Sequence, residues 1–230
     1  DLEPKINPPF EFKNPKLLLN DLQPSNMTIS EVADKYDMDI AIDHMMGAIF
    51  ASALGDCLGT STEFTNDGYA RFALDVPLSI LWNTLLEWHH SDSFYRGTVT
   101  DDTEQAVLIM RTLADCNGEP NLAHFGALLR NWAYRGISEH GQKQALDVGA
   151  TVYSAISSSS YTKDPLGHAL RNTSRSRGNG GAMRTAPVGC FKFWDLNTVI
   201  KNAINFSCVT HYSDICAVSV LAISLLIAKN

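Results

Sequence analysis

Residues 101–115, with the sequence DDTEQAVLIMRTLAD, decide the fold class of this chain. Apolar side chains recur in this stretch at three- and four-residue spacing, which places them on one face of an α-helix. Further helices are predicted over 39–59, 121–136, 144–159, 195–211 and 213–230, and a weaker one over 80–92. No segment shows the period-two alternation of a strand. The sequence therefore predicts an all-α fold. The apolar face of the deciding stretch is made by Ala106, Val107, Met110, Leu113 and Ala114.

The composition describes a globular and acidic chain. The 230 residues are 45% hydrophobic and 19% charged, which is enough for one sizeable core and argues against wholesale disorder. The formal net charge is -7, and the longest basic cluster, 171–184, is short and rich in glycine. A nonspecific nucleic-acid surface needs a basic stripe, so none is expected.

The cysteine pattern indicates a reducing compartment, and the hydropathy pattern indicates no membrane span. The five cysteines are scattered and form no C-x-x-C pair, which argues against a disulfide framework and a structural zinc site. The start of the sequence lacks a signal-peptide pattern. The longest apolar run, 215–228, is too short to span a membrane. We expect a soluble cytoplasmic or nuclear protein with no membrane partner.

The chain divides into an arm and a body. Residues 1–38 contain five prolines and predict an extended arm with one turn of helix near SEVADKY, whereas 39–230 form the domain. In the helix over 39–59, Gly47, Ala51 and Gly55 lie on one face that would let another backbone approach closely. The stretch 168–181 is predicted as a loop that re-enters a helix near Ala182, and 61–79 as a loop.

The segment TDDT, residues 100–103, supports two interpretations. Thr100 or Asp101 could cap the following helix, and Asp101 with Glu104 fits an acidic capping box. Alternatively, a hydroxyl and two carboxylates at a helix start can direct several oxygens toward a hard cation such as Mg²⁺. Two aspartates cannot surround a metal, so further ligands would be needed.

The segment RGNGGAMRTAPVG, residues 177–189, supports a phosphate cradle or a plain surface turn. Three glycines leave backbone N–H groups open, and a helix start after them adds positive dipole character. The segment matches neither a Walker A loop nor a dinucleotide fingerprint. Asp56 and Glu63 on a glycine-rich turn, and His211 behind Thr210, are equally compatible with structural roles.

Taken in order, these stretches resemble one known family. GAIFASALGDCLG, Glu63 in STEF, TDDT, GNGGAMRTAPVG and Thr210–His211 follow one another as in the ADP-ribosylglycohydrolases of the dinitrogenase-reductase-activating type. The resemblance runs from Gly47 to the end of the chain. It implies a compact orthogonal helical bundle around a cleft that binds two divalent cations, Mg²⁺ or Mn²⁺. It also implies that ADP-ribose or an ADP-ribosylated protein is the partner.

The resemblance assigns roles to individual residues. Thr100, Asp101 and Asp102 would be metal ligands. Glu63, on a mobile flap, and Asp102 would be catalytic. The bond broken would join the ribose anomeric carbon to a side-chain nitrogen or oxygen, with positive charge developing on the ring. The substrate-binding residues would be Asp56, Ser176, Gly178, Asn179, Gly180, Gly181, Met183 and His211.

The sequence departs from the family pattern at two points. The family completes its metal shell with a second Asp-x-Asp-Thr segment near the C-terminus, and no such segment occurs here. The apolar helix over 213–230 also stops abruptly. We therefore expect a domain that lacks its C-terminal helices, with weak two-metal binding and little hydrolysis if 1–230 is the entire protein. The second departure is Arg177, which precedes the Gly178–Asn179 pair.

Two alternatives to the hydrolase stay open. One is a non-catalytic relative that binds ADP-ribose or acts as a crystallin-like structural protein. The other is a metal-dependent phosphoesterase, for which only His211 with Asp214 would bring a histidine near a carboxylate. The sequence does not distinguish arginine, serine, a nucleobase or a free conjugate as acceptor, and it does not define the oligomeric state.

Overall fold

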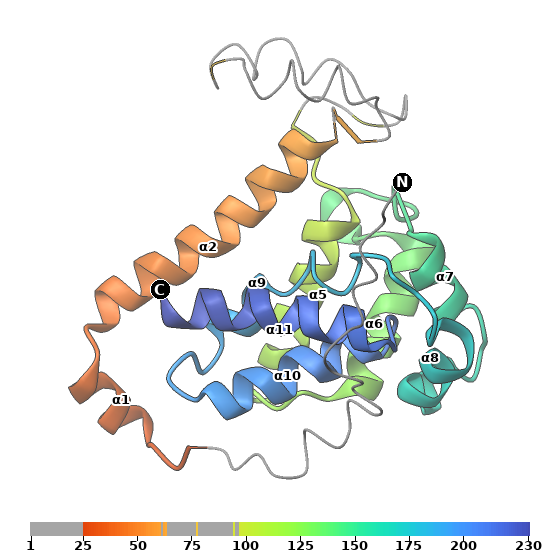
Figure 1. Ribbon diagram of the computed structural model, residues 1–230. Coiled ribbons are helices and arrows are strands. Elements are labelled where there is room, and N and C mark those ends of the chain that lie inside the picture. The colour runs from red at the N-terminus through yellow and green to blue at the C-terminus, as the bar shows by residue number, and fades with distance from the viewer. Residues whose placement is uncertain (1–24, 61, 64–76, 78–93, 95–96) are drawn as a thin grey trace, which may run out of the picture.

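The computed structural model describes residues 25–60, 62–63, 77, 94 and 97–230. Within these residues every regular element is a helix and no strand occurs, which confirms the predicted all-α fold (Figure 1). Two 3₁₀ turns, η3 (Ser138–His140) and η4 (Tyr161–Lys163), join the α-helices. The α-helices are α1 (Ile29–Lys35), α2 (Met38–Gly59), α5 (Asp101–Asp115), α6 (Leu122–Arg135), α7 (Ala150–Ile156), α8 (Pro165–Thr173), α9 (Ala186–Cys190), α10 (Leu196–Cys208) and α11 (Asp214–Lys229).

The core forms where the apolar faces of α5, α6 and α10 meet. Ile109, Phe125, Leu129 and Phe206 are fully buried there, and the Phe125 and Phe206 rings meet edge to face at 5.1 Å. Burying each such side chain contributes about 1.5–3 kcal/mol relative to leaving it exposed. The face predicted for 101–115 was only partly right, since Ala106 and Leu113 are buried but Ala114 is exposed, and Ile109, outside the predicted set, is fully buried.

The break predicted near Thr210 is confirmed. α10 ends at Cys208 and α11 begins at Asp214, where the Ser213 side chain accepts a hydrogen bond from the Cys216 N–H. The backbone carbonyl of Val209 accepts a hydrogen bond from the Tyr161 hydroxyl at 2.9 Å. His211 therefore lies in a tightly held turn between the two helices, and not in the first turn of α11.

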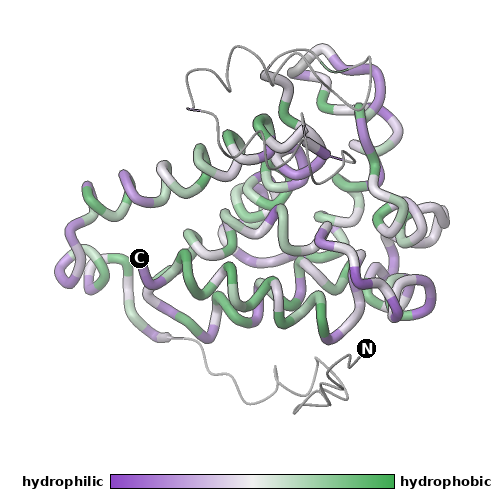
Figure 2. The backbone as a smooth tube through the Cα atoms, turned by 45° about the horizontal axis from the view of Figure 1, so that its top comes forward, coloured by the Kyte–Doolittle hydropathy of each residue, from purple (hydrophilic) through white to green (hydrophobic). Residues whose placement is uncertain are grey.

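Helix α2 stands away from the body and contacts it mainly through α5 and α9 (Figure 1). It carries exposed apolar side chains, with Ile40 54% and Phe50 64% exposed. The close approach predicted at its small face does not occur, because a Cβ on Gly47 or Gly55 would meet nothing within 4 Å among the described residues. Figure 2 shows apolar and polar positions alternating along α2, whereas the helix that ends at the C-terminus is largely apolar.

By length and composition alone, α2 could cross a membrane, and only 6% of its most apolar window is buried. One such helix is weak evidence, because core helices of soluble proteins, which are mostly buried, and N-terminal signal sequences meet the same criteria. The longest uninterrupted apolar run, 215–228, belongs to another helix, α11. In this fold α2 ends at the candidate site described below, to which it contributes a charged side chain.

Three predicted boundaries were wrong. The helix expected over 144–159 forms only as α7, Ala150–Ile156, because Gln142 hydrogen-bonds to Glu104 of α5 and holds the preceding stretch against that helix as a loop. The first part of the loop expected over 168–181 belongs to α8, which begins at Pro165 behind the capping side chain of Asp164. The helix after the glycines begins at Ala186 and not at Ala182.

The N-terminal arm is described from Ser25 onward, where it lies against the body. Thr28 and Glu31 form a capping box at the start of α1, which confirms the turn of helix predicted at SEVADKY. The backbone N–H of Ser25 donates to the Asp195 carboxylate at 2.7 Å, which ties the arm to the start of α10. Residues 1–24, the helix expected over 80–92 and most of the loop expected over 61–79 lie outside the described residues.

Candidate functional site

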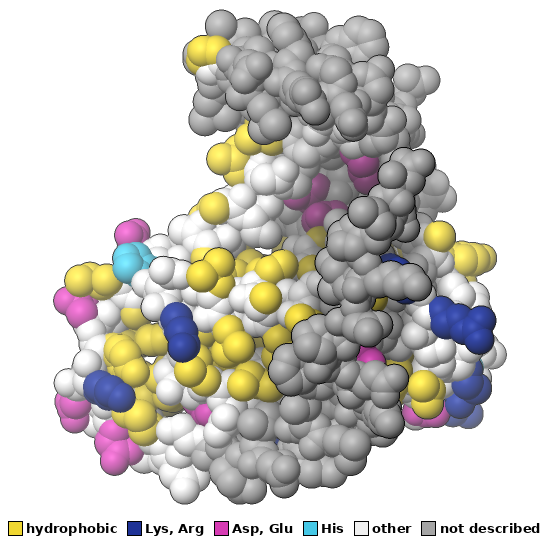
Figure 3. Space-filling model, in the orientation of Figure 1, with side chains coloured by type: hydrophobic (Ala, Val, Ile, Leu, Met, Phe, Trp, Pro, Cys, Tyr) yellow, Lys and Arg dark blue, Asp and Glu magenta, His cyan; other side chains and the backbone are white. Residues whose placement is uncertain are grey.

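A cavity of about 940 Å³ gathers most of the predicted site residues. Its walls are the last turns of α2, the start of α5, the segment 147–152, the glycine loop 178–183 and the turn that carries His211. Figure 3 shows acidic side chains gathered in a hollow beneath the upper end of α2. Pockets that enclose a small ligand typically measure about 300–1,000 Å³. The cavity is therefore large enough for a nucleotide-sized molecule.

Asp56 of α2 organises the acidic wall. Its carboxylate accepts hydrogen bonds from the Thr100 N–H at 2.8 Å and the Thr100 hydroxyl at 2.6 Å, and from the Thr103 N–H at 3.1 Å and hydroxyl at 2.6 Å. Thr100 occupies the N-cap position of α5, but its side chain makes no local cap bond. A carboxylate from another helix thus caps α5 and suits the positive end of its dipole.

The local capping box predicted from Asp101 and Glu104 is wrong. Glu104 is 1% exposed and accepts hydrogen bonds from the Trp132 indole at 2.7 Å and from the Gln142 amide. It therefore joins α5 to α6 and to the loop before α7. Because Glu104 turns inward, the carboxylates of Asp101 and Asp102 are the acidic groups of this turn that line the cavity.

The two carboxylates at the start of α5 lie where their ionised forms are disfavoured. Burial, followed by repulsion from Asp102, Asp147 and Asp56, raises the pKa of Asp101 to about 8. Burial, followed by repulsion from Asp56 and Glu63, raises the pKa of Asp102 to about 6. Removing a carboxylate from water and placing others nearby both disfavour the ionised form. A cation or a hydrogen-bond donor at this wall would relieve both effects.

Thr100, Asp101 and Asp102 offer the oxygen donors that hard cations prefer. The repulsion that raises the two aspartate pKa values also fits a site for positive charge. In the described part of the chain, however, no group of three or more His, Cys, Asp or Glu side chains converges closely enough to hold a metal ion. These residues therefore fit one side of a divalent cation, whose remaining ligands would come from water, substrate or other protein groups.

The glycine loop forms another wall of the same cavity. Asn179, Gly180 and Met183 line the cavity, and the backbone N–H groups of Asn179 and Gly180 make no hydrogen bond within the described part of the chain. Such open N–H groups suit an anionic ligand. The carbonyl oxygen of Ser176 accepts a hydrogen bond from the Ser213 hydroxyl at 2.7 Å, which attaches the loop to the start of α11.

His211 lies beneath this loop. It is 2% exposed, and a Cβ added to Gly180 would come within 2.9 Å of its Nε2 atom. Burial, followed by repulsion from Arg184, lowers the pKa of His211 to about 3. The ring is therefore neutral at physiological pH, and it meets the cavity as a hydrogen-bonding group and not as a cation.

Most of the predicted site residues meet at this cavity. Ser176 and Gly181 do not line it, because Ser176 supports the loop from behind and Gly181 packs on Ser207 of α10. Asp214, the partner that a phosphoesterase would need, is also absent from the lining. Glu63 is present at the rim, and most of the segment that follows it lies outside the described residues. The predicted residues that line the cavity are Asp56, Glu63, Thr100, Asp101, Asp102, Gly178, Asn179, Gly180, Met183 and His211.

Four further residues shape the site and were not predicted from the sequence. Thr103 binds Asp56, and Asp147 lines the cavity. Gln105 binds Asp101 at 3.0 Å, and its spacing of one helical turn was a usable signal. Arg184 is fully buried behind the glycine loop. An arginine shortly after the glycines can be seen in the sequence, but the sequence does not indicate which residues it contacts.

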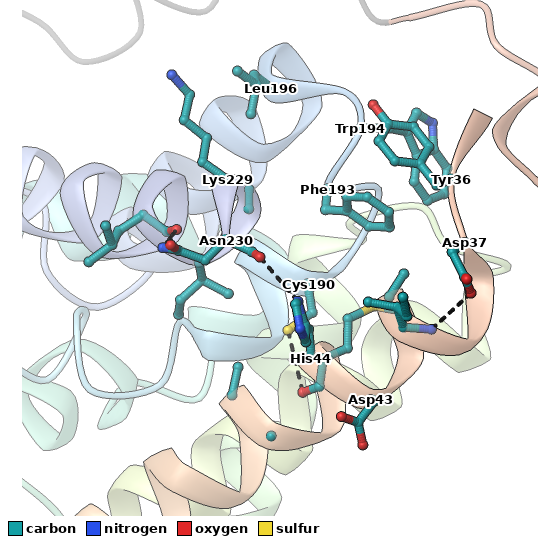
Figure 4. A pocket seen from close by; sticks show the side chains of 18 residues that line it. Tyr36, Asp37, Asp43, His44, Cys190, Phe193, Trp194, Leu196, Lys229 and Asn230 are labelled. Carbon is teal, nitrogen blue, oxygen red and sulfur yellow. Dashed lines mark hydrogen bonds between the residues drawn. The ribbon is translucent and has the colours of Figure 1, made fainter.

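A second cavity, of about 970 Å³, lies away from these residues (Figure 4). It opens between the start of α2, the aromatic pair Phe193–Trp194 and the end of α11. Tyr36 meets the Phe193 ring edge to face at 5.2 Å, and His44 Nδ1 lies 3.1 Å from the Asn230 carbonyl oxygen. This cavity holds none of the predicted site residues. The chemistry of the acidic wall and glycine loop therefore belongs to the first cavity.

Comparison with known proteins agrees with this arrangement. The chain is 26% identical over 183 residues to the ADP-ribosylarginine hydrolase Tri1 of Pseudomonas putida (strain GB-1), which covers 76% of this chain and 43% of that protein. It is also 26% identical over 191 residues to the uncharacterized protein YegU of Escherichia coli (strain K12), covering 81% of this chain and 54% of that protein. The chain thus spans about half the length of the curated relatives it matches.

The match to a protein family extends over nearly the whole described body. The model of the ADP-ribosylglycohydrolase family matches residues 37–229, from the residue before α2 to the last residue of α11. All the elements that form the acidic wall, the glycine loop and the His211 turn fall inside this range. The chain therefore belongs to the ADP-ribosylglycohydrolase family.

Proposed function

We propose that this chain binds ADP-ribose in the 940 Å³ cavity and acts in its hydrolytic removal from a modified acceptor. The observation that supports the proposal is that one wall of the cavity carries hydrogen-bond acceptors and another carries donors. Carboxylates at the start of α5 line the same cavity as a glycine loop whose Asn179 and Gly180 N–H groups lack partners in the described part of the chain. ADP-ribose has a matching polarity, since its diphosphate is an acceptor and its ribose hydroxyls are donors.

The diphosphate would lie at the glycine loop. An acidic chain repels phosphate over most of its surface, so binding needs a local site of positive potential. Open backbone N–H groups provide such potential, and His211 lies directly beneath them. Being buried, its neutral ring would contribute a directed hydrogen bond and would avoid the cost of a buried charge.

The ribose that carries the scissile bond would lie at the acidic wall. Thr100, Asp101 and Asp102 would hold a divalent cation, which when bound would supply a charge that orients the ribose hydroxyls and polarises water. The role proposed for Glu63 and Asp102 is to handle the proton of the attacking water. Both line the same cavity, and repulsion from Glu63 contributes to the raised Asp102 pKa, so the two carboxylates lie near each other.

Arginine is the acceptor to test first. The relative Tri1 is named an ADP-ribosylarginine hydrolase, and it matches 76% of this chain. The positively charged guanidinium of a modified arginine would also suit the acidic rim of the cavity. Serine-linked ADP-ribose provides the comparison, because its O-glycosidic bond presents no such charge.

The test combines calorimetric titration of ADP-ribose with chromatographic measurement of its release from an ADP-ribosylated arginine peptide. Saturable binding and release that requires Mg²⁺ or Mn²⁺ are expected. Asp102→Asn should abolish release while leaving the thermal midpoint no lower than that of the parent chain. Asp34→Asn, an exposed carboxylate on α1, is the matched control and should leave both unchanged. Absence of ADP-ribose binding with either cation present would refute the proposal.

Binding without turnover is the second candidate. It is favoured by the finding that the acidic side chains in the described part of the chain do not converge into a complete metal site. This candidate predicts the same ADP-ribose titration curve but no release from the arginine-linked or the serine-linked peptide. The two candidates therefore separate on the release assay alone.

A further inference from the structure

Arg184 is a buried cation whose direct partners are all neutral. It is 0% exposed, and its Nη2 donates to the Phe206 carbonyl at 2.6 Å and to the Thr210 hydroxyl at 2.6 Å. Its Nη1 donates to the amide oxygen of Gln105, and its guanidinium stacks 5.3 Å from the centre of the Phe125 ring. Its Nε has no hydrogen-bond partner within the described residues. Burying a guanidinium costs several kcal/mol unless it is well paired, so its retention needs an explanation.

On one side, Arg184 fixes the orientation of an amide. Gln105 is 0% exposed, and its oxygen accepts from the guanidinium. Because an arginine only donates, the Gln105 oxygen must face it, and the amide NH₂ must face the other way. That NH₂ donates to Asp101 Oδ2 at 3.0 Å. Arg184 thereby determines that the NH₂ group of Gln105, and not its oxygen, faces Asp101 in the acidic wall.

On the other side, Arg184 fixes the direction of a hydroxyl. Thr210 is 0% exposed, and its oxygen accepts from Arg184 Nη2 while lying 2.9 Å from His211 Nδ1. A hydroxyl has one hydrogen to donate, and the guanidinium cannot accept it. In the described part of the chain, the His211 Nδ1 atom is the acceptor within reach of that hydrogen. The ring hydrogen of a neutral His211 then lies on Nε2, the ring nitrogen on the side of Gly178 and Gly180.

We propose that Arg184 is a positioning residue that, through Thr210, holds His211 in the Nε2–H tautomer and, through Gln105, orients the Asp101 carboxylate. One buried guanidinium thereby keeps the His211 Nε2–H donor under the glycine loop and holds the Asp101 carboxylate, a hydrogen-bond acceptor, at the acidic wall. The Nε2–H group would donate to an oxygen of the bound molecule, of the kind that a diphosphate provides. The identity of that molecule rests on the proposed function, whereas the tautomer does not.

The test observes the imidazole directly. Two-bond proton–nitrogen NMR spectra of ¹⁵N-histidine-labelled protein, without ligand and near neutral pH, distinguish the two neutral tautomers. The unmodified chain should give the Nε2–H pattern for His211, identified by its loss in His211→Asn. Thr210→Val retains the shape of the side chain but removes the hydroxyl, and should give a mixture of tautomers or the Nδ1–H form. An Nδ1–H pattern in the unmodified chain, or an unchanged pattern in Thr210→Val, would overturn the proposal.

Three further variants complete the design. Thr210→Ser keeps a hydroxyl and should restore the Nε2–H pattern, whereas Ser219→Ala removes an exposed hydroxyl on α11 and serves as a matched control. Arg184→Met should alter the His211 pattern together with the carboxylate ¹³C shift of Asp101. If Arg184→Met does not fold, Gln105→Leu and Thr210→Val separate the two branches, because each should change only its own readout. A Gln105→Leu variant in which the His211 pattern changes and the Asp101 carboxylate ¹³C shift stays the same would contradict the proposal.

Affinity provides the link to function. Titration of ADP-ribose should show about tenfold weaker binding for Thr210→Val, the effect of losing one well-placed hydrogen bond to a charged group. Thr210→Ser should bind within about twofold of the unmodified chain. If ADP-ribose binds neither form while the tautomer patterns behave as described, the proposed function fails and the positioning role of Arg184 stands.

Discussion

The Asp56 carboxylate of α2 accepts a hydrogen bond from the Thr100 hydroxyl at 2.6 Å, although the two residues lie 44 positions apart in the chain. The same carboxylate binds both the N–H and the hydroxyl of Thr103. These contacts join α2 to α5 and determine where the first turn of α5 presents its carboxylates. The acidic wall thus depends on a helix whose other main contact with the body is α9.

Asp56→Asn should weaken both the fold and the wall. The amide keeps one acceptor oxygen but brings an NH₂ group against threonine donors, so at least one of the four hydrogen bonds becomes a donor–donor contact. We expect a loss of about 1–3 kcal/mol in the free energy of unfolding, measured by urea denaturation. Asp39→Asn, an exposed carboxylate at the other end of α2, should change it by less than about 0.5 kcal/mol. Equal effects of the two substitutions would show that Asp56 does not join the helices.

Asp101 should make the metal-free protein less stable as pH rises. Its pKa is raised from 3.8 to about 8, so the folded state holds a proton that the unfolded state has lost. This contribution is complete below pH 3.8 and disappears as pH rises through 8. Asp101→Asn should therefore match the parent at low pH and exceed it at pH 8 by about 2–5 kcal/mol. Thermal melts in the presence of a chelator test this expectation.

The effect of a divalent cation serves as the internal control for Asp101. If the wall accepts Mg²⁺ or Mn²⁺, the cation should raise the thermal midpoint of the parent at pH 8 and leave that of Asp101→Asn unchanged. A parent chain whose stability rises between pH 5 and pH 8 without any cation would contradict the raised Asp101 pKa.

The first two glycines of the loop should differ in their tolerance of a methyl group. A Cβ on Gly180 would lie 2.7 Å from His211 Cε1, whereas on Gly178 its nearest contact is His211 Nε2 at 3.5 Å. We expect Gly180→Ala to cost about 1–3 kcal/mol and to shift the His211 ring resonances. Gly178→Ala should stay within about 0.5 kcal/mol of the parent. Similar His211 spectra in both variants would mean that the loop lies farther from the ring than described.

Gln142 should hold the segment that forms one side of the cavity. Its amide donates to Glu104 and its oxygen accepts from the Ile137 N–H at 2.8 Å, so one side chain anchors the loop before α7. Gln142→Ala should increase amide hydrogen exchange over residues 137–149 while leaving α10 protected. Lys143→Ala, a change at the exposed neighbour, is the control and should leave exchange unchanged. Uniformly faster exchange throughout the chain would indicate global destabilisation and not a local anchor.

The features predicted correctly from the sequence are those that depend on residues close together in the chain. The helical spacing of 101–115 predicted the burial of Ala106 and Leu113, and the break between the helices over 195–211 and 213–230 was also predicted. TDDT and the glycine loop were identified because their chemistry is contained in a few consecutive residues. These local patterns were sufficient for the fold class and for most of the residues that line the cavity.

The features that the sequence did not predict depend on contacts between residues far apart in the chain. Asp56 meets Thr100 across 44 positions, and Arg184 meets Gln105 across 79, so no local spacing could connect them. For the same reason Glu104 was misassigned to a capping box, since its partner Trp132 lies 28 positions away. The helix predicted before Ala150 failed because tertiary hydrogen bonds of Gln142 outweighed local helical propensity.

The apolar side chains that α2 and α11 leave in water have a thermodynamic consequence. Phe50 is 64% and Leu226 65% exposed in the folded chain, so unfolding transfers little additional apolar surface from these positions into water. The heat capacity increment of unfolding arises mainly from such transfer. Scanning calorimetry of this chain should therefore give an increment below the usual ~12–15 cal/mol/K per residue. Its stability would then vary less with temperature, and cooling would weaken it less, than for a fully packed domain of the same length.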